Sequence, residues 1–218
     1  MKSLVIAGAT GLIGGQVIDE LAGLDGVQVE ALLRRPVESL PHSIRQHVAS
    51  GENWASLITS MRPDVAICCL GTTIKTAKSQ AAFRVVDHDL VVAFAGAARK
   101  AGAKHVIAVS SVGASASASN FYLKTKGEAE DGLRALGFDR VDILRPGLLT
   151  GGTRPEGRPA EAIGAMVSPF TDLLMIGPLA KYRSTPSAKV ARAIVTLALG
   201  GGYGQFIHEN DSISALSG

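Results

Sequence analysis

The chain has 218 residues, of which 46% are hydrophobic and 19% are charged. This length and composition support one globular domain with a sizeable core and exclude an intrinsically disordered protein. The net charge of +3 arises from 22 Lys and Arg against 19 Asp and Glu, without a run of five like charges. We therefore expect no nucleic-acid partner and, because no 18-residue apolar segment occurs, no membrane span.

The first part of the chain alternates short apolar runs with helical patterns. The apolar runs predict strands over residues 3–8, 27–34, 44–49 (the weakest), 64–70, 105–111 and 141–147. Helical periodicity predicts helices over residues 11–24, 53–61, 80–101 and 122–136. This alternation is typical of βαβ units, so we predict an α/β fold, a doubly wound parallel sheet of the Rossmann type.

The pattern changes after Gly147. Residues 148–160 are rich in Gly, Pro and Arg and predict a loop. A helix at about 160–175, a second helix over 187–200 and a strand over 204–209 follow. We predict one dinucleotide-binding domain over residues 1–218, with the tail over the carboxyl edge of the sheet and residues 148–185 as a substrate-side lobe.

Two adjacent cysteines, Cys68 and Cys69, lie in the apolar run "DVAICCLG". Adjacent cysteines cannot close an ordinary disulfide loop, and no His or Cys with metal-ligand spacing lies nearby. We expect buried, reduced thiols, no metal, and a location in the reducing cytoplasm.

The stretch "AGATGLIGG" (7–15) follows the first predicted strand and opens the first predicted helix. Glycines in this place permit a tight turn and let the backbone approach a pyrophosphate, whose charge meets the helix N-terminus. A simple strand–helix turn is the alternative. The predicted cofactor-binding residues in this loop are Gly8, Thr10, Gly11, Leu12, Ile13 and Gly14.

The end of the second predicted strand, "ALLRRP", bears on the choice of cofactor. An acidic residue there would hold a ribose hydroxyl of NAD, but the strand ends in Arg34 and Arg35, and Glu30 lies too early. The planar guanidinium group suits a 2′-phosphate. We therefore expect NADP (NADPH), with NAD less favoured; the alternative is that both arginines are merely solvated.

The stretch "CLGTT" (69–73) ends the fourth predicted strand, at the sheet edge where a dinucleotide would bind. A glycine there lets the backbone come close, and the threonines can bond ribose or phosphate, although an ordinary turn would look the same. The candidate cofactor contacts are Leu70, Gly71, Thr72 and Thr73.

These motifs, followed by "VSSVGAS", "YLKTK" and "LRPG" in this order, resemble the short-chain dehydrogenase/reductase superfamily. The phrases "VDHD" (86–89), "SNFYLKTKGEAE" (119–130) and "FDRVDILRPGLL" (138–149) resemble the atypical branch that includes the Tat-interacting-protein oxidoreductases. The resemblance covers roughly residues 3–210, and the ordered set is more specific than any single motif.

The resemblance implies roles for particular residues. Tyr122 would be the general acid that protonates a substrate carbonyl oxygen as hydride arrives. Lys126, one helical turn away, would favour the phenolate and bond the nicotinamide ribose. Ser111, in preference to Ser110, would orient the carbonyl. The nicotinamide side of the pocket would be formed by Pro146, Gly147 and Leu148.

Two departures from the pattern stand out. Many relatives carry an Asp after the third strand to hold the adenine, where this chain offers only Ser50. Many also carry an Asn in the helix after the fourth strand that completes a proton relay, where this chain has Asp87. Arg154 and Arg158, in the loop after the sixth strand, would hold an anionic substrate or be solvated.

The function that the resemblance implies is an NADPH-dependent oxidoreductase acting on a carbonyl/alcohol pair of a small molecule. An NADPH/NADP-sensing regulatory protein without turnover and a sugar-nucleotide epimerase are the alternatives. The apolar helix "VVAFAGAA" packs either on the sheet or on a second copy, so a homodimer stays open. His88 and His105 are expected to be structural, whereas His208 could face the substrate lobe.

Overall fold

The computed structural model describes residues 1–151 and 177–218. The predicted helix at 160–175, Arg154, Arg158 and most of the predicted lobe at 148–185 therefore lie outside the described residues. Within the described part of the chain, no helix combines the length and apolar character that crossing a membrane requires.

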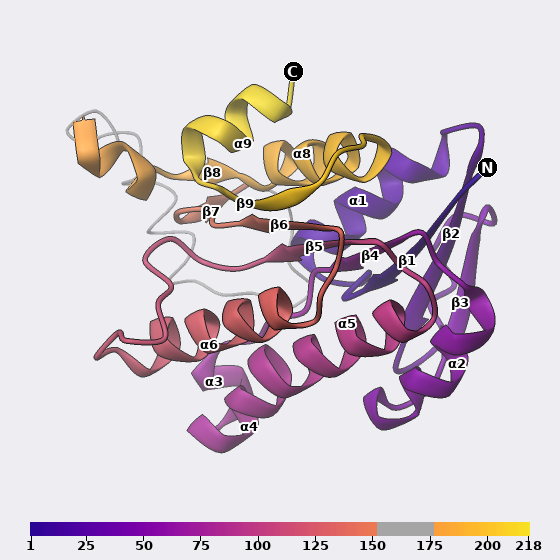
Figure 1. The fold of residues 1–218 in the computed structure, drawn as a ribbon, viewed down its shortest axis with the longest axis horizontal. Coiled ribbons are helices and arrows are strands. Elements are labelled where there is room, and N and C mark those ends of the chain that lie inside the picture. Colours follow the sequence, from indigo (N-terminus) through magenta and orange to yellow (C-terminus); the bar gives the residue numbers. More distant parts are fainter. Residues whose placement is uncertain (152–176) are drawn as a thin grey trace.

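Seven parallel strands form one sheet in the order β3-β2-β1-β4-β5-β6-β9 (Figure 1). This arrangement confirms the predicted doubly wound fold. The strand order reverses between β1 and β4, and ligands of such sheets bind at the carboxyl ends beside this switch point. The strands are β1 Lys2–Ala7, β2 Val27–Leu33, β3 Ile44–Val48, β4 Val65–Cys68, β5 His105–Val109, β6 Arg140–Leu144 and β9 Gly204–His208.

Helices cover both faces of the sheet (Figure 1). One face is covered by α1, α8 and α9, and the other by α2, α5 and α6. The α-helices are α1 Leu12–Ala22, α2 Trp54–Met61, α3 Ile74–Ala77, α4 Gln80–Arg84, α5 Leu90–Lys100, α6 Phe121–Ala135, α8 Ser187–Leu199 and α9 Asn210–Leu216. The smaller elements are 3-10 turns at Gly51–Asn53 and Gly177–Tyr182, a π turn at Val85–Asp89, and the two-stranded pair β7 Leu149–Thr150 and β8 Thr185–Pro186.

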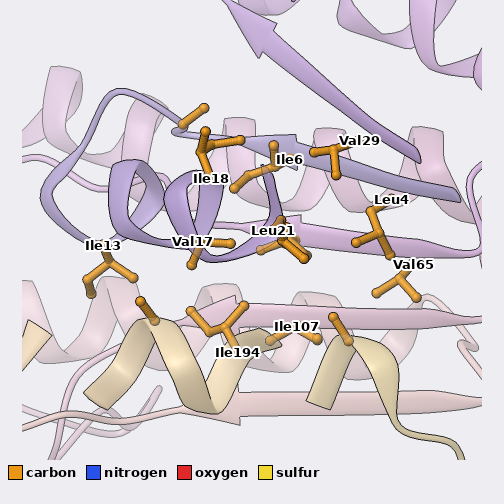
Figure 2. Packing of buried hydrophobic residues seen from close by; sticks show 14 of the residues in the cluster. Leu4, Ile6, Ile13, Val17, Ile18, Leu21, Val29, Val65, Ile107 and Ile194 are labelled. Atoms are coloured by element: carbon orange, nitrogen blue, oxygen red, sulfur yellow. The ribbon is translucent and has the colours of Figure 1, made fainter. Parts of the chain in front are cut away.

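The central strands β1, β4 and β5 are largely apolar because both of their faces are buried, whereas the edge strand β3 is mostly polar and exposed. Alternate residues of β1 enter different cores: Leu4 and Ile6 join the cluster under α1 and α8, and Val5 joins the cluster under α2, α5 and α6. On α1, residues Val17 and Leu21 lie one turn apart and pack on the first cluster (Figure 2). The period of two in the strand and of about 3.6 in the helix thus fixes which side chains meet.

The tail differs from the prediction that placed it over the carboxyl edge of the sheet. Helix α8 packs beside α1, with Ile194 fully buried in the first cluster (Figure 2). Strand β9 pairs with β6 and becomes the seventh strand. Residues from Ser187 onward therefore complete the sheet and its helical layer.

The helix predicted over residues 80–101 is present in three consecutive segments. Helix α4 begins after Ser79, whose side chain accepts a hydrogen bond from the backbone N–H of Ala82. The π turn Val85–Asp89 then joins α4 to α5. Asp87, which stands where many relatives have an asparagine, lies within this π turn.

Candidate functional site

The glycine turn between β1 and α1 packs directly on the end of β4. Gly8 has a φ of +86°, and a Cβ there would lie 2.5 Å from the carbonyl carbon of Cys69. A Cβ on Gly14 would lie 2.1 Å from the carbonyl oxygen of Gly8. Both positions therefore require glycine, and the turn holds the start of α1 at the carboxyl edge of the sheet.

The N-terminus of α1 has the character of an anion site. Its cap residue, Gly11, contributes no side-chain hydrogen bond, and no acidic residue lies in the first turn. Gly11 and Thr10 are exposed, Leu12 is half-buried and Ile13 is buried in the core. Exposed backbone and the positive end of the helix dipole together suit a pyrophosphate, so these residues fit a dinucleotide.

The two arginines after β2 lie at the surface of the protein. Arg34 and Arg35 are both exposed, and within residues 1–151 and 177–218 neither guanidinium forms a hydrogen bond or an ion pair. By contrast, Glu30 is 3% exposed, and its carboxylate contacts His47 at 2.5 Å and Arg45 at 3.4 Å. The carboxylate of Glu30 is thus already paired, whereas Arg34 and Arg35 have no partner among the described residues and could contact a ligand.

The loop after β4 is tied to the π turn. The backbone N–H of Thr72 donates a 2.9 Å hydrogen bond to Oδ2 of Asp87. The hydroxyl of Thr73 caps α3 by accepting from the N–H of Thr76 at 3.2 Å. Gly71 is exposed, while Leu70 packs partly against the core under α5. The exposed backbone at Gly71 and the Thr72 side chain are therefore more accessible to a ligand than the Thr73 hydroxyl, which already caps α3.

Tyr122 and Lys126 lie on α6 beneath this loop and do not form a solvated surface pair. The Tyr122 ring is half-buried, with its centroid 5.6 Å from that of Phe83. The Lys126 side chain is only 7% exposed, and its Nζ lies 2.8 Å from Oδ1 of Asp87. Burial by itself lowers the pKa of Lys126, but the neighbouring carboxylate of Asp87 outweighs this effect and the pKa is raised above its ordinary value. Lys126 is therefore an ammonium ion.

The two serines after β5 have different surroundings. The hydroxyl of Ser110 donates a 2.5 Å hydrogen bond to Oε1 of Glu130. Ser111 is half-buried, and among the described residues its hydroxyl makes only a long contact, at 3.4 Å, with the carbonyl of Val112. Ser110 is thus a structural residue, and the geometry favours Ser111 as the serine with a hydroxyl available for a ligand.

The segment after β6 is locked to the C-terminal part of the chain. A Cβ on Gly147 would lie 2.1 Å from the carbonyl oxygen of Arg183, and the Gly147 N–H donates to Oγ1 of Thr185 at 3.2 Å. Leu148 is 48% exposed, and its carbonyl accepts from the Thr185 N–H at 2.8 Å. Pro146 is buried. The backbone contacts with Thr185 therefore hold Gly147 and Leu148 in place after β6.

Glu130 is a central residue of the site region that the sequence motifs did not reveal. Its side chain is 2% exposed and accepts hydrogen bonds from Ser110 and from Arg145, whose Nε lies at 2.9 Å. It thereby joins the ends of β5 and β6 to α6. Its position one turn after Lys126, among the buried residues Ala129 and Leu133, was the available signal.

Two of the histidines lie in structural positions. His105 and His208 each contact the buried carboxylate of Asp142 through Nε2 at 2.7 Å. His208 therefore points into the protein, toward Asp142 on the neighbouring strand β6.

Comparisons with known proteins identify a family for this chain. A family described as NAD(P)H-binding matches residues 8–199. The mitochondrial protein fmp52 of Aspergillus clavatus is 34% identical over 226 residues, covering 100% of this chain and 96% of that protein. Protein HTATIP2 of Rattus norvegicus is 34% identical over 221 residues, covering 99% of this chain and 89% of its own.

Solved structures share the fold at low sequence identity. MoeE5 in complex with UDP-glucose and NAD has a TM-score of 0.70 and 17% identity, covering 99% of this chain and 80% of that one. The UDP-glucose 4-epimerase of Thermotoga maritima has a TM-score of 0.72 and 17% identity, covering 95% and 76%. At this identity the likeness establishes the fold alone.

The cytoplasmic location predicted from the sequence is wrong, since the fungal relatives are named as mitochondrial proteins. Cys68 and Cys69 are free thiols, of which Cys68 is buried as predicted and Cys69 is only partly buried; burial raises the pKa of Cys68 to about 11. Because these two cysteines are adjacent, their free state does not indicate a compartment.

Proposed function

The chain belongs to the NAD(P)H-binding family, in the atypical short-chain dehydrogenase/reductase branch, and we propose that it is an NADPH-dependent oxidoreductase. Its substrate is the carbonyl or alcohol form of a small molecule. The observation that carries the proposal is the buried ammonium of Lys126, one helical turn from Tyr122, at the sheet edge where the glycine turn opens α1.

The proposed chemistry assigns each side chain one task. The nicotinamide supplies or accepts the hydride when it is bound. Tyr122 donates the proton to the carbonyl oxygen, and the fixed charge of Lys126 stabilises the phenolate that remains. Ser111 holds the carbonyl oxygen through its hydroxyl. The residues around them supply position and electric field.

The cofactor preference rests on Arg34 and Arg35. Both guanidiniums are exposed and unpaired within the described residues, so they can pair with a 2′-phosphate without breaking an existing contact. Ser50, which stands where relatives hold adenine with an Asp, is exposed, and its hydroxyl accepts a hydrogen bond from Asn53 at 3.0 Å. We therefore propose that no carboxylate contacts the adenine from position 50.

Calorimetry with NADPH and NADH tests the cofactor assignment. The wild-type protein should bind NADPH more tightly, and Arg34→Ala combined with Arg35→Ala should weaken NADPH binding roughly tenfold to a hundredfold while leaving NADH unchanged. Arg192→Ala, an exposed arginine on α8, is the matched control. Equal affinity of the wild-type protein for the two cofactors would overturn the NADPH preference.

Oxidation of NADPH over a panel of aldehydes and ketones tests the role of Tyr122. Tyr122→Phe should lower turnover of any accepted substrate by roughly a hundredfold or more, and NADPH affinity should remain within about twofold. Tyr203→Phe, which changes an 81% exposed tyrosine, is the control. Tight binding without turnover of any carbonyl compound would favour the cofactor-sensing alternative.

A further inference from the structure

Asp87 lies between the two parts of the proposed site. It is fully buried, and its two carboxylate oxygens face two different donors. Oδ1 lies 2.8 Å from Nζ of Lys126 on α6, and Oδ2 accepts the N–H of Thr72 after β4 at 2.9 Å. Gly71 lies beside both, because a Cβ there would be 3.6 Å from Oδ1 of Asp87 and 3.7 Å from Nζ of Lys126.

This double contact requires a carboxylate. An asparagine has one acceptor oxygen and one donor group, so it would accept from either Lys126 or Thr72 and turn its NH₂ group toward the other donor. The π turn Val85–Asp89 that carries Asp87 is a rare element, and such turns are frequent at functional sites. Asp87 therefore contacts both donors directly, which an asparagine in the same position could not do.

The charged and titratable groups around Lys126 come from three elements. Asp87 approaches from the π turn, Tyr122 from α6 and Cys68 from β4. Burial raises the pKa of the Cys68 thiol to about 11, so it is uncharged at neutral pH. Asp87 is thus the counter-ion that offsets the burial of the ammonium.

We propose that Asp87 is the positioning residue of this site: it holds Lys126 as a fixed cation and couples it to the Gly71–Thr72 backbone. The inference rests on the proposed oxidoreductase function. It implies that Lys126 acts by its charge and does not carry protons, because a buried ammonium bonded to a carboxylate does not release its proton near neutral pH. The loop that would contact the cofactor and the lysine beside Tyr122 then move as one unit.

The test is the pH dependence of NADPH binding, measured by calorimetry between pH 7 and 9. Wild-type affinity should stay nearly constant over this range. In Asp87→Asn the buried lysine lacks its counter-ion, so its pKa falls and the affinity should drop about tenfold toward pH 9. Asp89→Asn, which changes a neighbouring carboxylate that is 53% exposed, should follow the wild-type profile.

Thermal unfolding supplies a second readout that needs no cofactor. Asp87→Asn should lower Tm by roughly 10 °C, because it leaves a buried charge unpaired, and adding Lys126→Met should recover most of the loss. An Asp87→Asn profile that parallels the wild type, or a double variant that recovers nothing, would overturn the inference. A wild-type protein that binds neither NADPH nor NADH would instead overturn the proposed function.

Discussion

Gly127 directly follows Lys126 on α6 and leaves no room for a side chain. A Cβ at this position would lie 2.1 Å from the carbonyl carbon of Ser115 and 2.3 Å from the nitrogen of Ala116. These atoms belong to the backbone after Ser111, which cannot rotate away as a side chain would. The absence of a side chain at Gly127 therefore allows α6 to approach the backbone of Ser115 and Ala116 this closely.

Gly127→Ala should lower the free energy of unfolding by roughly 1–3 kcal/mol, because overpacking against backbone exceeds the gain in helix propensity. Gly96→Ala is the matched control: it lies inside α5, where a Cβ would meet Leu136 at an ordinary 3.5 Å. That variant should be neutral or more stable by about 1 kcal/mol. Urea unfolding of both proteins measures the difference, and equal stability of the two variants would contradict the close approach of α6 to the Ser115 backbone.

At the scale of elements, Glu130 fastens α6 to the ends of β5 and β6. Its carboxylate accepts from Ser110 at 2.5 Å and from Nη2 of Arg145 at 2.5 Å. The hydrogen bond to Glu130, together with its charge, raises the pKa of Arg145 against the effect of burial. Ser111 and Pro146 each directly follow a residue held in this way, so Glu130 supports both sides of the site.

Glu130→Gln should destabilise the protein by roughly 3 kcal/mol, because the amide turns a donor toward a partly buried guanidinium. Asp131→Asn is the natural comparison. Asp131 is 61% exposed and pairs with the neighbouring Arg134 at 2.8 Å. An exposed pair of this kind contributes within about 0.5 kcal/mol. If urea midpoints showed equal losses for the two variants, Glu130 would not be the joint between these elements.

The elements themselves were largely predictable from the chain, and their ends were not. The apolar runs located β1, β2, β4, β5 and β6, because a strand buried on both faces is mostly apolar. The run predicted over 141–147 leaves the sheet after Leu144, however, since the Gly147 N–H is bonded to Thr185. That partner is 38 residues away and gives no local signal.

The site was predictable in its glycine turn and its tyrosine–lysine spacing, but not in its supporting contacts. The contacts of Asp87 in the π turn are with Lys126 and Thr72, which lie in other elements. Helix α9 was missed because "NDSISAL" has few apolar residues, and the buried Asn210 amide instead donates to the carbonyl of Arg183 at 3.0 Å. Polar contacts over long sequence distances leave no periodicity to detect.

At the scale of the whole molecule, Asp142 joins the last strand to the rest of the sheet. It is fully buried on β6, and it contacts His105 on β5 and His208 on β9, each at 2.7 Å. Arg140 adds a contact through Nε at 2.5 Å. His208 also contacts Ser212 of α9 at 2.9 Å. One carboxylate thus links β5, β6, β9 and the C-terminal helix.

This network predicts loss of stability in acid. Burial alone would raise the pKa of Asp142, but hydrogen bonds from His105, His208 and Arg140 hold the pKa well below its ordinary value of 3.8. The unfolded chain therefore binds a proton at higher pH than the folded protein does. The contribution is fully present above the unfolded pKa of about 4 and is lost as the pH falls through the lower folded pKa.

Urea unfolding of the wild-type protein and of Asp142→Asn at pH 7, 5, 4 and 3 would measure this contribution. The variant should be less stable by roughly 3 kcal/mol at neutral pH, because Arg140 and the histidines lose their buried partner. The difference in free energy of unfolding between the two proteins should stay constant down to about pH 5. It should decrease below pH 4, where protonation of Asp142 in the unfolded chain begins to reduce the stability of the wild-type protein. Asp139→Asn, an exposed carboxylate just before β6, should follow the wild type throughout. If the difference in stability between the wild type and Asp142→Asn stayed constant down to pH 3, the packing of the Asp142 side chain, and not its charge, would hold the edge of the sheet together.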